Sequence, residues 1–156
     1  VLQEHRITIV LTHAYEGGHP DHDATSFVAH AARCKLQREG WPPIRILEFP
    51  LYHSRGGRMQ AQEFPTSEGC EIAIRLDAPT VAAKREMLAA FTTQRQTLLQ
   101  LDADLERFRI APDYDFTILP NGGDLLYECF DWGLSGETWL SLVNDARERL
   151  GLPQWL

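Results

Sequence analysis

Two histidines, His19 and His22, lie three positions apart in the segment THAYEGGHPDHDA, with Asp21 and Asp23 interleaved. On a first helical turn, two imidazoles at this spacing can approach one point, or one can bind a metal while the other faces a substrate. A helix N-terminus disfavours imidazolium, which favours the neutral form that ligates metals. The alternative is a polar capping loop in which the acids only complement the helix dipole.

The flanking sequence predicts the elements that position this segment. Residues 6–12, RITIVLT, are almost continuously apolar or β-branched, which predicts a strand buried on both faces at the centre of a parallel sheet. Apolar residues then recur every three or four positions over residues 20–39, which predicts a helix with Pro20 in its first turn. Residues 44–49 predict a second strand. In open α/β sheets, ligands commonly bind at the carboxyl ends of strands, where the chain continues into a helix. The histidine segment is therefore the candidate site.

Five further segments carry a recognisable pattern. The sequence predicts a long irregular loop at 50–69, a half-exposed edge strand at 71–77, a helix at 79–101, another helix or its continuation at 102–109, and a short strand at 125–130. Ser135 is predicted to cap a last helix. The expected fold is α/β, a Rossmann-like three-layer sandwich with a mostly parallel sheet, forming a single domain over residues 1–156.

The amino-acid composition argues against several classes of function and partner. The net charge of -7 and the absence of a Lys/Arg cluster argue against a nucleic-acid partner. No apolar run approaches the ~20 residues of a membrane span, and no charged-then-apolar leader opens the sequence, which predicts a cytoplasmic protein without a membrane partner. The three cysteines lack CxxC spacing, so neither a disulfide framework nor a thiolate zinc site is expected.

The motif GGHPDHDAT, placed after a strand and at the start of a helix, closely resembles the second metal motif of the PIG-L/LmbE-like N-acetylglucosaminyl deacetylases. KREMLAAFTTQRQTL and YDFTILPNGGDLLYECFDWGLSGETW resemble later parts of that family. The resemblance implies a hydrolase, dependent on zinc or another divalent metal, that removes acetyl from an N-acetylglucosamine-type amine. It implies that His22 is a metal ligand, that His19 stabilises the oxyanion or protonates the leaving amine, and that Asp21 orients His19.

The residues around this motif carry further expectations. Tyr15 and Glu16 directly precede the histidines, and we expect them to border the sugar, with simple turn roles as the alternative. Trp132 and Trp139 are expected to pack in the core or at its rim rather than to form a sugar platform.

One family motif has no counterpart in this sequence. The family carries an N-terminal A-H-P-D-D-E-type motif whose His and second Asp complete the metal site and whose first Asp is the general base. We therefore expect residues 1–156 to be the C-terminal two thirds of a deacetylase domain whose N-terminal part is missing, inactive alone but active within the parent protein. The alternative is a non-catalytic carbohydrate-binding or assembly module with a degenerate metal site. The expected partner is a small amino-sugar substrate, and a homo-oligomer remains open.

Overall fold

The computed structural model describes all 156 residues and shows a mixed α/β fold. Its main sheet has the strand order β1-β2-β6-β5. β1 (Ile9–His13) pairs in parallel with β2 (Arg45–Phe49), and β6 (Leu105–Ile110) runs antiparallel to both β2 and β5 (Glu71–Arg75). The prediction of a mostly parallel sheet is therefore wrong, because β6 returns against its neighbours instead of crossing over to run alongside them.

The β1-α1-β2 unit carries the candidate site. The helix prediction is confirmed by α1 (Pro20–Arg38), and the second strand is confirmed by β2. β1 is an edge strand rather than a central one, since it pairs with β2 alone. Ile9 and Leu11 are consequently 48% and 55% exposed, although their pattern predicted burial on both faces.

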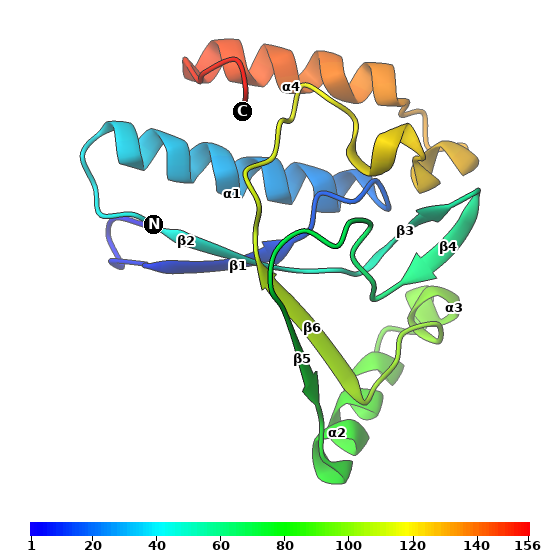
Figure 1. Cartoon of the computed structure of the whole chain (residues 1–156). Helices are drawn as coiled ribbons and strands as arrows, with labels where there is room; N and C mark the ends of the chain where they lie inside the picture. The colour runs from blue at the N-terminus through cyan, green and yellow to red at the C-terminus, as the bar shows by residue number, and fades with distance from the viewer.

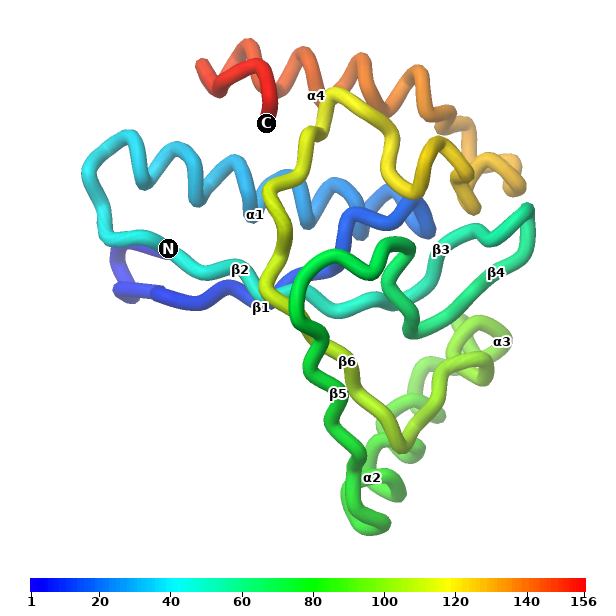
Figure 2. Tube along the Cα trace, in the orientation of Figure 1, coloured from blue at the N-terminus to red at the C-terminus, as the bar shows by residue number.

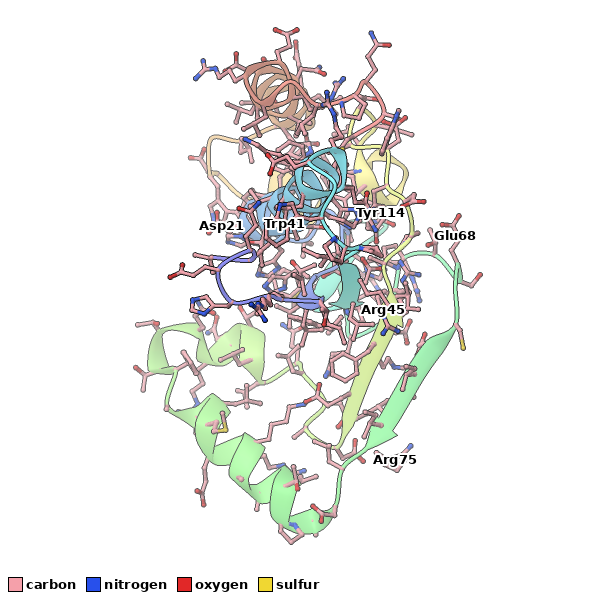
Figure 3. The ribbon with its side chains drawn as sticks, turned by 90° about the vertical axis from the view of Figure 1, so that its left-hand side faces the viewer. Asp21, Trp41, Arg45, Glu68, Arg75 and Tyr114 are labelled. Atoms are coloured by element: carbon pink, nitrogen blue, oxygen red, sulfur yellow. The ribbon has the colours of Figure 1, made fainter.

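The last helix, α4 (Gly136–Leu150), begins at the predicted cap, where the Ser135 side chain accepts a hydrogen bond from the Thr138 N–H. α4 packs on α1, so the layers run from sheet to α1 to α4 on one side, rather than helix, sheet, helix (Figures 1 and 3). The core between these layers comprises Tyr15, Phe27, Ala31, Cys34, Phe116, Trp139, Val143 and Leu156. We call residues 9–49 and 111–156 the body.

A second region projects away from the body. β5 and β6 run outward together, and α2 (Ala78–Ala89) and α3 (Arg95–Leu98) fold back beside them (Figures 1 and 2). We call residues 71–101 the arm, and none of them is buried. The predicted continuous helix over 79–101 is broken, because the backbone leaves helical geometry at Phe91 (φ -86°, ψ 69°).

Three other predictions of local structure are wrong. Residues 50–69 contain a hairpin of β3 (Tyr52–Arg55) and β4 (Arg58–Ala61), whose turn residues Gly56 and Gly57 both have positive φ. The predicted helix at 102–109 is β6, held by pairing with strands on both of its sides. The predicted strand at 125–130 is a 3₁₀ helix at Leu126–Cys129. None of the helices combines the length and apolar character that crossing a membrane requires.

Candidate functional site

The histidine segment connects the carboxyl end of β1 to the first turn of α1, at the right-hand side of Figure 1. The Asp23 carboxylate is fully buried, and its Oδ1 accepts hydrogen bonds from the Glu16 and Gly17 N–H groups, each at 3.1 Å. Burial raises the pKa of Asp23 to about 7. This carboxylate ties the loop to the helix that follows it, so the histidines project from a fixed backbone.

The two glycines of the motif are required by the local geometry. Gly17 has a φ of +72°, in the left-handed region. A Cβ added to Gly18 would lie 1.8 Å from the carbonyl oxygen of Tyr52, so no side chain fits there. The loop therefore packs directly against the start of the β3-β4 hairpin.

The Glu16 side chain also connects the histidine segment to the start of the β3-β4 hairpin. Its Oε1 accepts hydrogen bonds from the Leu51 and Tyr52 N–H groups, at 2.8 and 3.1 Å. The residue is fully buried, and burial raises its pKa well above the ordinary range. Tyr52 in turn packs on His22, with ring centroids 5.4 Å apart. Glu16 thus fixes the position of Tyr52, whose ring contacts His22, the candidate metal ligand.

His22 lies between two other imidazoles. Its ring stacks on His13, with centroids 4.1 Å apart and 10° between the planes, and lies 5.0 Å from the ring of His19. Burial lowers the pKa of His22 to about 3, and it also lowers the pKa of His13. Both imidazoles are therefore neutral at pH 7, the form that binds metals.

His19 caps α1 with its own side chain. Its Nδ1 accepts a hydrogen bond of 3.1 Å from the Asp21 N–H, so the neutral ring carries its proton on Nε2. The Asp21 carboxylate lies 3.9 Å from Nδ1 and its side chain is 88% exposed. The backbone of Asp21, rather than its carboxylate, therefore orients the His19 ring.

The metal expectation can be tested against the donor atoms present. No three or more His, Cys, Asp or Glu side chains are grouped so that they could hold a metal ion. His22 fits a metal by itself, because it is neutral and its Nδ1 is buried without a hydrogen-bond partner. The stacked rings of His13 and His22 direct their in-plane lone pairs side by side rather than at one ion. His13 Nδ1 is likewise buried without a hydrogen-bond partner, so the chain offers two imidazole donors that do not converge on one ion, fewer than the three protein ligands of a catalytic zinc site.

Tyr15 and Glu16 both lie in the interior of the fold. Tyr15 is 4% exposed, and its hydroxyl donates to the Ile118 carbonyl and accepts from Trp139 Nε1. The buried Glu16 carboxylate accepts its hydrogen bonds from the backbone at the start of the β3-β4 hairpin. These placements are at odds with the expected substrate-binding roles, because the strand-to-helix turn directs both side chains inward and not toward the histidines.

Sequence reasoning missed the contacts that aromatic rings make with the histidines. Trp139 is buried as expected, but Trp132 is 48% exposed and its ring lies 4.9 Å from that of His19. Tyr52 belongs to β3, which the sequence did not predict. His13 was not missed: its place at the end of the first strand makes it either a ligand by spacing or a hydrogen-bonded structural residue. No sequence pattern connects Trp132 to His19.

A comparison with protein-family models, curated proteins and solved structures found no match for this chain. The function is therefore inferred from the motif and from the geometry around it.

Proposed function

We propose that this chain carries the histidine half of the active site of a metal-dependent N-deacetylase acting on an N-acetylglucosamine-type amide. The observation that carries the proposal is a neutral His22 with a buried, unpartnered Nδ1, in ring contact with an oriented His19. The resemblance of GGHPDHDAT to the deacetylase motif supplies the reaction class. A divalent metal such as Zn²⁺, when bound, supplies a water of lowered pKa for attack on the amide carbonyl.

Within this proposal His22 is a metal ligand, and His19 stabilises the oxyanion of the tetrahedral intermediate. The bond from the Asp21 N–H to Nδ1 leaves Nε2–H of His19 as a donor, and 29% of the His19 side chain is exposed to receive a ligand. A fixed donor aimed at a developing charge favours the transition state over the ground state. Asp21 acts as a positioning residue through its backbone.

The remaining ligands and the general base must come from outside these 156 residues. We propose that the chain is the C-terminal part of a Rossmann-like deacetylase domain and that a further strand lies along the open side of β1. Two features support this: β1 is unpaired on its outer side, and its Ile9 and Leu11 are exposed. A strand added there would end beside His13 and His22, at the edge of the sheet where ligands bind.

The lack of a three-ligand group favours the second candidate, a non-catalytic carbohydrate-binding or assembly module. Metal content separates the two candidates. We expect the natural full-length polypeptide to bind about one divalent ion per chain, as a catalytic site requires, and we expect His22→Ala to lose it. His5→Ala is the matched control, because the His5 side chain is 63% exposed and lies outside the cluster.

Activity tests the role of His19. We expect His19→Ala to retain the metal and to lower kcat for acetate release by about 10²–10³-fold, the usual loss for one oxyanion donor. Full activity in His19→Ala would remove this residue from the mechanism. A wild-type polypeptide free of both metal and activity would overturn the deacetylase proposal and leave the binding module.

A further inference from the structure

Two stacked aromatic side chains, Phe130 and Trp132, lie beside His19 and are exposed to solvent. The rings of Phe130 and Trp132 stack with centroids 4.6 Å apart and 14° between the planes, and the two side chains are 47% and 48% exposed. The Trp132 ring lies 4.9 Å from the His19 ring, at an angle of 51°. The pair therefore extends the row of rings that runs through His19, His22 and His13 to the surface.

The backbone around this pair is fixed to the histidine loop. The Leu126 N–H donates to the Gly17 carbonyl over 2.8 Å, which joins the preceding 3₁₀ helix to the motif. On the other side, the Glu128 carboxylate accepts a hydrogen bond of 2.6 Å from the Gly136 N–H at the start of α4. Anchors on both sides hold the pair at a set place relative to His19, which is a property of a binding surface rather than of a free loop.

Core packing does not explain why the Phe130 and Trp132 rings are exposed. Trp139 and Phe116 show how this fold buries aromatic rings, at 5% and 0% exposure. Trp132 lies in the same C-terminal region but leaves about half of its surface in water, at a cost in apolar hydration. Exposed aromatic rings next to a reactive group are typical of ligand sites.

We propose that the pyranose ring of the substrate lies on a free face of the stacked Trp132–Phe130 pair, which we call the platform and which determines the specificity of the site. The identity of the ligand rests on the deacetylase function proposed above. The C–H face of a pyranose is apolar and slightly positive, so it is attracted to the negative face of an aromatic ring. Asp131, which lies between Phe130 and Trp132 in the sequence, and Asp21 are exposed and carry carboxylates that can accept hydrogen bonds from sugar hydroxyls. A ring held at Trp132 presents its acetamido substituent next to His19.

Binding of N,N′-diacetylchitobiose, followed by saturation-transfer NMR and by tryptophan fluorescence, tests the platform without requiring turnover. We expect Trp132→Ala to weaken binding by about tenfold and Trp132→Phe to retain most of it, because stacking is the interaction removed. Trp155→Ala is the matched control: Trp155 is 56% exposed and follows the far end of α4, so this variant should bind as wild type does. Cyclohexanol, a ring with one hydroxyl, should bind more weakly than the sugar.

The outcomes separate this proposal from the deacetylase proposal. Trp132-dependent sugar binding by a protein without deacetylase activity would support the platform and overturn the reaction. Deacetylase activity with an unchanged KM in Trp132→Ala would support the reaction and overturn the platform. Absence of sugar binding by the wild type, or binding of cyclohexanol as tight as that of the sugar, would also overturn the platform. Because Trp132 is half exposed, thermal unfolding should confirm that its variants fold.

Discussion

The body and the arm both consist of helices and strands that carry apolar side chains, yet only the body has a core. In the body, α1, α4 and the segment around Phe116 enclose a cluster of buried aromatic and aliphatic side chains. In the arm, Ile72 and Ile74 are 51% and 46% exposed, and Phe91 is 59% exposed. The difference teaches that an apolar stripe is buried only where a second layer covers it, and the arm has no such layer within this chain.

The largest effect should come from the centre of the body. Phe116 is fully buried against Tyr15, Phe27 and His30, and Phe116→Ala should lower the free energy of unfolding by about 3–5 kcal/mol. The matched change in the arm, Phe91→Ala, should cost less than about 0.5 kcal/mol, because little burial is lost. Urea unfolding of both variants measures the contrast, and equal losses would show that the arm is covered in solution.

A buried ion pair joins β6 to β2, where the chain passes from the arm to the body. Arg109 of β6 is 2% exposed, and its Nε donates to Glu48 Oε1 of β2 over 2.7 Å. Arg109→Met should destabilise the protein by about 3 kcal/mol, because it leaves the Glu48 carboxylate buried without its cation. The double variant Glu48→Leu/Arg109→Met should recover most of this loss, since two apolar groups of similar size carry no desolvation cost.

A double-mutant cycle by urea unfolding measures this coupling. A double variant no more stable than Arg109→Met would show that the ion pair does more than neutralise Glu48. The hydrogen bonds that Arg109 donates to the carbonyls of Thr66 and Glu68 would then account for the loss of stability.

A smaller effect should appear as a pH dependence of stability. The body contains three of the four histidines whose pKa is lowered, His13, His22 and His30. His30 is fully buried, and burial together with the nearby Arg33 cation lowers its pKa from 6.5 to about 4. Between these two pH values the unfolded chain binds a proton that the folded chain does not, so stability is lost as the pH falls from 6.5 to about 4.

His30→Gln should flatten this slope by at most about 1.4 kcal/mol per pH unit, the contribution of one proton. Thermal or urea unfolding at several pH values measures the slope. His5→Gln is the control, because His5 is exposed and should leave the slope as in the wild type. An unchanged slope in His30→Gln would mean that His30 is protonated in the folded body.

The sequence alone determined those features that depend on neighbours along the chain. The β1-α1-β2 unit, the positive φ of Gly17 and the Ser135 cap of α4 follow from apolar periodicity, from a glycine turn and from capping chemistry. The motif itself also marked His19 and His22 as the candidate reactive pair. In each case the physical cause lies within a few residues of its effect.

The tertiary structure decided what depends on distant partners. β6 was predicted as a helix because the sequence LERFRI does not reveal the strands that pair with it, and β1 was predicted as central because its apolar pattern does not show that it lies at an edge. The inward direction of Tyr15 and the place of Trp132 beside His19 likewise arise from packing between segments far apart in the chain. Strand pairing and side-chain contacts of this kind are set by the free energy of the whole fold, which no local pattern encodes.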